Sequence, residues 1–263
     1  LPVALKGWVL GLASEPSMLE GFVLGIPVLL ADMGILLVLI YGFYLKSAKA
    51  VYLYWCSPVV FYINYLHGQL DVIPMFFLLA GMLLLTRRHV LWSAVVVGLG
   101  VACKENLLLA LPFLGVFAFR REGVRLGLSF AALVGALYVL LIGPFLGSDG
   151  YQLMVLRAEE RGWIFESTLV LGATELVLIP LLLSVLWLNL TMYRRANNDL
   201  LVMYVGLAFT TVLMFVPGNA PGWYLWLIPF FTYYSLRAID FSPLTLVVFS
   251  GLFFAYFAVE LPH

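Results

Sequence analysis

Long apolar runs separated by short polar islands constrain the fold of this chain more than any other feature. A helix needs about 20 apolar residues to cross a bilayer, and in lipid the backbone polar groups must be satisfied within a helix or a closed barrel. Of the residues, 64% are hydrophobic and 11% are charged, whereas soluble domains carry about 25% charged residues. The sequence therefore predicts an all-α, polytopic transmembrane helical bundle of about ten segments. These are residues 20–45, 50–66, 72–85, 90–103, 107–119, 124–146, 168–192, 200–216, 223–236 and 244–259.

The positions of the basic residues predict how these segments cross the membrane. Positively charged connections face the cytoplasm in most membrane proteins. If every segment spans, all five basic islands fall on one side. Joining segments 90–103 and 107–119 into one kinked helix would move the last three islands to the other side, so we predict two separate helices. The islands are Lys46/Lys49, Arg87/Arg88, Arg120/Arg121/Arg125, Arg194/Arg195 and Arg237.

The other connections are predicted to face the cell exterior, the periplasm or a lumen. We assign residues 1–19 as a juxtamembrane segment on this outer face and residues 20–263 as the transmembrane helical domain. Polar residues other than basic anchors concentrate in the outer connections, which predicts a site on the extracytoplasmic side of a plasma, inner or endoplasmic reticulum membrane. The 14 basic and 14 acidic residues balance, which gives no reason to expect a nucleic-acid partner.

The sharpest local feature is the turn from His67 to Asp71, which places an imidazole, the Gln69 amide and a carboxylate at the membrane boundary. Gly68 permits a tight turn, and Pro74 suits the first turn of the next helix. One interpretation is a hairpin in which Asp71 caps that helix. The other is a functional site formed by His67, Gln69 and Asp71, with Asp71 as the visible carboxylate best placed for acid/base work.

Charged residues in two other outer connections are candidates for binding phosphate. Lys104 and Glu105 lie between two apolar stretches, where charge is costly unless it is paired or faces water. Either the two form a self-neutralising turn, or the Lys104 ammonium contacts a lipid phosphate. Arg157 and Arg161 are four residues apart and would share a face of a helix. They could bind a phosphate together, or they could belong to an amphipathic interfacial helix.

The remaining singular residues favour structural interpretations. Trp223, Tyr224 and Trp226 are typical of interfacial belt aromatics, although such rings also stack on sugars. Asp32 is predicted to pair within the bundle. Cys56 and Cys103 lie in different apolar runs and are expected to be buried small hydrophobes rather than a metal site. No metal is assigned, and no nucleotide-binding loop, zinc-protease or hydrolase motif is present.

Several short motifs follow one another in the order seen in the GT-C superfamily of membrane glycosyltransferases. They are Ile26–Asp32 (IPVLLAD), Trp55–Pro58 (WCSP), Gly68–Pro74 (GQLDVIP), Lys104–Asn106 (KEN) with Leu111–Pro112, and Trp223–Pro229 (WYLWLIP). The chain resembles members that use dolichyl- or polyprenyl-phosphate sugars, over about two-thirds of its length. The resemblance implies transfer of a sugar from a polyprenyl-phosphate donor to a lipid or glycan acceptor on the outer face, and among sugars it favours mannose. It implies membrane lipids and lipid-linked sugar as partners, no assigned cofactor besides the donor, and an open requirement for a divalent metal.

One family feature is not matched. The usual catalytic Asp lies in the first outer loop after a first helix, and this sequence begins close to the end of that loop, where Glu15 and Glu20 match no motif. The base is therefore expected before Leu1, or the chain is a non-catalytic GT-C-like subunit that holds a partner membrane protein. A lipid or solute transporter is a further alternative, although Asp32 is almost alone as a charge in the middle of a segment.

Overall fold

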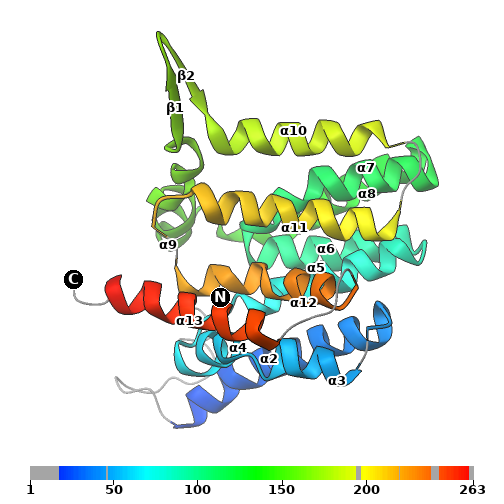
Figure 1. The fold of residues 1–263 in the computed structure, drawn as a ribbon. Helices are drawn as coiled ribbons and strands as arrows, with labels where there is room; N and C mark the ends of the chain where they lie inside the picture. Colours follow the sequence, from blue (N-terminus) through cyan, green and yellow to red (C-terminus); the bar gives the residue numbers. More distant parts are fainter. Residues whose placement is uncertain (1–17, 46, 194–196, 219, 238–242, 261–263) are drawn as a thin grey trace.

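A computed structural model describes residues 18–45, 47–193, 197–218, 220–237 and 243–260. These residues form a mostly helical bundle with one small β-hairpin (Figure 1). The longer helices are α2 (Met18–Leu37), α5 (Val72–Thr86), α6 (Val90–Cys103), α7 (Leu111–Glu122), α8 (Val124–Ile142), α10 (Leu178–Met192), α11 (Asn198–Phe215), α12 (Ile228–Arg237) and α13 (Pro243–Glu260).

Short helices and tighter or wider turns join these elements. The short α-helices are α3 (Ser47–Ala50), α4 (Pro58–Phe61) and α9 (Asp149–Tyr151). Wider π-helical turns are Val38–Gly42, Val51–Trp55, Tyr62–Leu66 and Gln152–Leu156. Narrower 3₁₀ turns are Glu105–Ala110, Gly143–Phe145, Glu159–Arg161, Trp163–Phe165 and Pro221–Trp226. Three of these turns, Gln152–Leu156, Glu159–Arg161 and Trp163–Phe165, follow one another in the connection between the predicted segments 124–146 and 168–192.

Three described helical stretches are long and apolar enough to cross a membrane. They are Gly25–Gly42, Val124–Phe145 and Asn198–Phe215. Shorter apolar helices cover Val72–Thr86, Val90–Cys103, Leu178–Met192 and Leu244–Ala258. The membrane class of the fold is thus supported, while a full set of ten spans remains a prediction from the sequence.

Close packing of small residues joins α5 to α6. A Cβ atom on Gly81 would lie 2.4 Å from a methyl group of Val97, so only glycine allows this approach. The buried Ser93 hydroxyl donates a 2.7 Å hydrogen bond to the Gly81 carbonyl. Small residues and hydroxyl groups are the usual means of helix association where lipid removes the hydrophobic driving force.

Backbone chemistry explains one interruption that the sequence does not predict and one boundary that it does. Segment 50–66 is interrupted at Ser57, which is extended (φ −65°, ψ 121°) because Pro58 disfavours the helical region for the residue before it. Segments 90–103 and 107–119 are separate, as predicted, because Lys104 is extended between α6 and the turn Glu105–Ala110.

The prediction that residues 168–192 form one transmembrane segment is wrong for its first ten residues. Thr168–Leu171 (β1) and Thr174–Val177 (β2) pair as an antiparallel hairpin, and α10 begins only at Leu178. The turn residue Gly172 has φ +62°, a conformation that glycine adopts without strain and that suits two-residue hairpin turns. Threonine and valine favour strands here, which apolar length alone does not detect.

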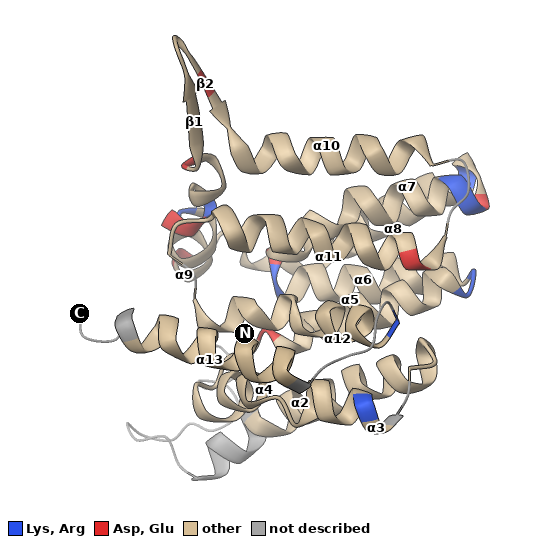
Figure 2. Cartoon of the chain, viewed as in Figure 1, with Lys and Arg blue, Asp and Glu red and all other residues tan. Residues whose placement is uncertain are grey.

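Basic residues gather at one end of the bundle, where α5 turns into α6 and α7 turns into α8 (Figure 2). Arg88 pairs with Glu122 at 3.8 Å, and Arg121 donates to the Asn198 side chain at 2.6 Å. Arg237 approaches Asp199 at 3.9 Å, which brings the end of α12 to the same place. The described basic islands therefore share one end, as the sequence predicts. Lys46, Arg194 and Arg195, with the segment 1–17, lie outside the described residues.

Two interpretations of single residues have different outcomes. Asp32 is 1% exposed and accepts hydrogen bonds from the hydroxyl groups of Tyr54 (2.6 Å) and Tyr65 (2.7 Å), which confirms its pairing within the bundle. Cys56 and Cys103 are free and exposed. The expectation that they are buried is wrong, because apolar residues of a membrane bundle can face outward as well as inward.

Candidate functional site

Asp71 lies at the centre of a buried polar cluster near the end of the bundle opposite the basic islands. Its side chain is 2% exposed. Its Oδ1 atom accepts hydrogen bonds from the Lys104 ammonium at 2.5 Å and from the Trp226 indole N–H at 2.8 Å. The Lys104 ammonium also lies 5.5 Å from the centre of the Trp226 ring, within cation–π range. Three distant parts of the sequence therefore meet at one carboxylate.

Local backbone geometry positions the Asp71 and Lys104 side chains in this cluster. Gly68, with φ +73°, turns the chain before Asp71 at the start of α5. The extended Lys104 leaves α6, so its side chain departs from the helical path. Asp71 makes no capping hydrogen bond with its side chain. The capping interpretation is thus wrong, since the carboxylate points to Lys104 and Trp226 instead of to the first turn of its own helix.

Gly222 closes the other side of the Asp71 carboxylate. A Cβ atom at Gly222 would lie 2.7 Å from Asp71 Oδ2 and 2.9 Å from Gln69 Oε1. Gln69 and Asp71 therefore lie together against the turn Pro221–Trp226. His67 is exposed, and its ring lies 5.9 Å from the ring of Tyr62.

A second polar cluster forms around Glu105, the residue next to Lys104. Its Oε1 atom accepts hydrogen bonds from the hydroxyl groups of Tyr138 and Tyr151, the latter at 2.7 Å. Its Oε2 atom pairs with the Arg161 guanidinium. Lys104 pairs with Asp71, and Glu105 pairs with Arg161, so the two neighbours do not neutralise each other and the interpretation of a self-neutralising turn is wrong.

The predicted convergence of Arg157 and Arg161 on one helical face is wrong. The π-helical turn ends at Leu156, and Arg161 belongs to the separate 3₁₀ turn Glu159–Arg161. Ala158, between them, is not helical (φ −59°, ψ 129°), which breaks the four-residue periodicity. Arg157 is exposed and makes no ion pair with a residue that the structure describes.

Aromatic rings extend from the Asp71 cluster to the outer loop. Trp223 stacks on Trp226 with ring centres 5.2 Å apart, and Trp163 lies 5.9 Å from Trp223. Tyr224 packs instead against Phe253 and Phe257 of α13 at 5.1 and 5.7 Å. The two predicted aromatics therefore differ: Trp223 lies beside the charged cluster, while Tyr224 joins the packing with the last helix.

Asp71 with Lys104 and Glu105 with Arg161 are each neutral as pairs, and the loop beside them adds the exposed Arg157, Glu159 and Glu160. Among the groups of the two clusters, Lys104 is the cation best placed to contact an anionic ligand. The Lys104 side chain is 32% exposed and its ammonium has three donor hydrogens, so it can bind a second acceptor besides Asp71. Within the described residues, no three His, Cys, Asp or Glu side chains are grouped to hold a metal ion.

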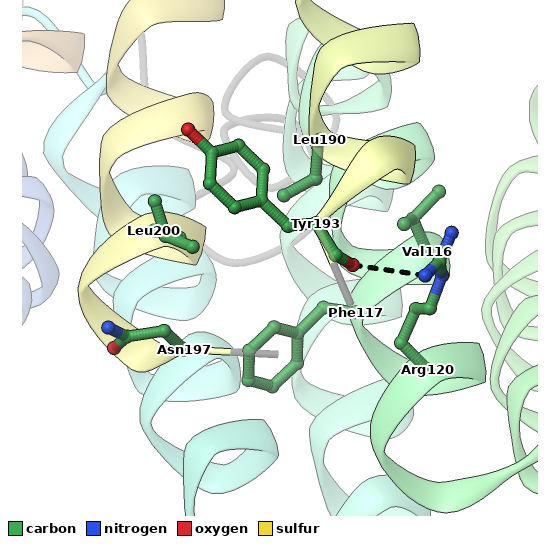
Figure 3. Close-up of a pocket in the computed structure, with 7 residues that line it drawn as sticks. All are labelled: Val116, Phe117, Arg120, Leu190, Tyr193, Asn197 and Leu200. Carbon is green, nitrogen blue, oxygen red and sulfur yellow. Dashed lines mark hydrogen bonds between the residues drawn. The ribbon is translucent and has the colours of Figure 1, made fainter. Parts of the chain in front are cut away.

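A pocket at the basic end is unrelated to this cluster (Figure 3). It lies between α7, α10 and α11, where Arg120 donates to the backbone carbonyls of Thr191 and Tyr193, the latter at 3.0 Å. Arg120 thereby satisfies carbonyl groups that the end of α10 leaves free. None of the residues that line this pocket is a predicted site residue. They are Val116, Phe117, Arg120, Leu190, Tyr193, Asn197 and Leu200.

Sequence reasoning does not find several members of the two clusters. The pattern of the chain groups Trp226 with the belt aromatics, and Tyr138 is hidden in the apolar run 124–146. Gly222 and Tyr151 carry no motif signal. A polar hydroxyl in the middle of an apolar run is the one signal that singles out Tyr138, because such groups need a partner in lipid.

Comparison with known proteins identifies the chain. No curated protein and no solved structure matches it. The ALG3 protein family matches residues 28–169, more than half of the 263 residues. The matched part includes Asp71, Lys104, Glu105 and Arg161, whereas Trp226 lies beyond it. The chain therefore belongs to the ALG3 family, a GT-C family of membrane mannosyltransferases that use dolichyl-phosphate-mannose.

Proposed function

We propose that this chain transfers mannose from dolichyl-phosphate-mannose to a lipid-linked oligosaccharide on the extracytoplasmic, lumenal face of the endoplasmic reticulum membrane. Membership of the ALG3 family supports the donor, the acceptor class and the membrane. The observation that carries the proposal is the Asp71–Lys104–Trp226 cluster. It places an ordered cation beside aromatic rings near the end of the bundle opposite the basic islands.

In this proposal the Lys104 ammonium contacts the phosphate of the donor. Asp71 holds the ammonium in place from the protein side, and the exposed part of Lys104 faces the ligand. A cation here stabilises the charge that develops on the departing lipid phosphate, and it acts most strongly in a site that excludes water. Arg157 and Arg161, the latter paired with Glu105, are further candidates for contact with the phosphate, while His67, Gln69 and Trp223 line the sugar or acceptor side.

Asp71 remains our candidate for acid/base work. Its Oδ2 atom accepts no hydrogen bond from a residue that the structure describes, so one carboxylate oxygen is chemically free. A base must come within hydrogen-bond reach of the acceptor hydroxyl. Gly222 lies close against Oδ2, and a side chain at this position would contact that oxygen.

The test is to measure donor binding and mannose transfer separately with the purified chain in lipid vesicles. Lys104→Met should weaken donor binding by about 10- to 100-fold, the loss of one charge-assisted hydrogen bond. Asp71→Asn should abolish transfer while weakening donor binding far less than Lys104→Met does. The matched control is Lys49→Met, an exposed lysine at the basic end, which should change neither.

Other outcomes would change the assignment. Equal weakening of donor binding by Asp71→Asn and Lys104→Met would make Asp71 a positioning residue for Lys104. Donor binding without transfer in the wild-type chain would favour a non-catalytic subunit that needs a partner. Unchanged donor binding in Lys104→Met would remove Lys104 from the phosphate site.

A further inference from the structure

The β1–β2 hairpin projects away from the bundle at the end that carries the outer loop. The helices run side by side, and the hairpin extends across their direction beyond α10 (Figure 1). If the helices cross a bilayer, an element at right angles to them lies along the membrane surface. The hairpin is therefore placed at the level of the interface, pointing sideways into the lipid region.

The register gives the hairpin two chemically different faces. Side chains of directly paired residues lie on the same face, and successive residues alternate. Leu169 pairs with Leu176 and Leu171 pairs with Thr174, which makes one face apolar and uncharged. Val170 pairs with Glu175 on the opposite face, which carries the one charge of the hairpin.

The apolar face is exposed in the isolated chain. Leu169 and Leu171 are 45% and 55% exposed, and Val170 on the other face is 67% exposed. A two-stranded hairpin alone is at best marginally stable in water. An amphipathic element whose apolar side lies in the boundary between headgroups and acyl chains is stabilised by burial of that side.

The hairpin continues a surface that already faces lipid. Leu181, Val185 and Leu188 on α10 are exposed by 43%, 53% and 54%. The base of the hairpin is fixed to the bundle, because Leu178 N–H donates to the Ser167 carbonyl at 2.8 Å and the Ser167 hydroxyl donates to the Phe215 carbonyl. The hairpin thus has a set height relative to the ends of α10 and α11.

We propose that the β1–β2 hairpin is an interfacial membrane anchor, with Leu169, Leu171 and Leu176 inserted among the lipids of the extracytoplasmic leaflet and Glu175 turned toward water. The occupant of the apolar face is lipid rather than protein, because the hairpin leads directly into α10, whose Leu181, Val185 and Leu188 are exposed, and because it lies across the direction of the helices. This anchor is independent of the sugar-transfer chemistry.

The test is a spin-label scan of residues 168–177 in vesicles, in a background with Cys56→Ala and Cys103→Ala. Labels at Leu169→Cys and Leu171→Cys should be reached by oxygen and shielded from a water-soluble nickel chelate. Labels at Val170→Cys and Glu175→Cys should be reached by the chelate. Leu188→Cys serves as the lipid reference.

A pattern of accessibility that alternates from residue to residue requires a folded hairpin. A variant that unfolds the hairpin would lose this pattern and could not produce the expected result. If the chelate reaches Leu169 and Leu171 as easily as Glu175, the hairpin stands in water and the proposal is wrong. If neither reagent reaches the apolar face, a protein covers it, and the lipid assignment is equally overturned.

Discussion

Loss of Lys104 should destabilise the protein more than loss of Lys104 together with the charge of Asp71. In Lys104→Met the Asp71 carboxylate keeps one described donor, the Trp226 indole, while its side chain stays only 2% exposed. Removing one partner of a buried ion pair costs about 3–5 kcal/mol. The Lys104 side chain is 32% exposed, so the pair is not fully desolvated. We therefore expect a loss of about 3 kcal/mol, at the lower end of that range.

The double variant Asp71→Asn/Lys104→Met removes the stranded charge. The neutral amide oxygen that replaces the carboxylate can still accept from the Trp226 indole, and the methionine side chain can fill much of the space of the lysine. What is lost is one hydrogen bond, worth about 1 kcal/mol. The double variant should thus be about 2 kcal/mol more stable than Lys104→Met, although it carries one more substitution.

The assay is reversible unfolding in mixed detergent micelles, followed by the helical circular dichroism signal. Circular dichroism is preferable to tryptophan fluorescence because Trp226 is itself part of the cluster. Lys49→Met is the matched control and should leave the free energy of unfolding unchanged. If the two substitutions were simply additive, so that the double variant was the least stable, the coupling of Asp71 to Lys104 would be refuted.

Three further variants test other contacts. Gly222→Ala should lower stability and weaken donor binding, because its new methyl group would lie 2.7 Å from Asp71 Oδ2. The control in the same thermal unfolding and binding assays is Gly115→Ala, whose Cβ atom would meet nothing within 4 Å. Ser93→Ala should cost about 0.6 kcal/mol in the micelle assay, a typical value for a hydrogen bond between helices in a membrane. Asp32→Ala should cost about 2–4 kcal/mol, because it leaves two tyrosine hydroxyl groups without their acceptor; a melting temperature equal to that of the wild type would contradict this.

Local sequence patterns predict those features that neighbouring residues determine. The membrane class follows from apolar length, since a bilayer allows few alternatives to a helical bundle. The break at Lys104 follows from a charged pair between two apolar runs, and the shared end of the basic islands follows from their spacing. The pairing of Asp32 follows from the cost of a carboxylate in an apolar helix, although its tyrosine partners are not predicted.

Local sequence patterns give wrong predictions where the same apolar composition is compatible with two kinds of secondary structure. Residues 168–177 are apolar enough to extend a helix, yet Gly172 and the β-branched residues form a hairpin. The predicted arrangement of Arg157 and Arg161 fails for a related reason, since four-residue spacing has meaning only if the chain between them is helical.

The sequence by itself determined that this chain is a helical membrane protein, placed polar residues at one end, and supplied the motifs of a mannosyltransferase family. Only the tertiary structure decided that Asp71 meets Lys104, 33 residues away, and Trp226, 155 residues away. The physical reason is range. Helix length and turn chemistry are fixed by neighbours along the chain, whereas the partner of a buried charge is fixed by which helices pack together.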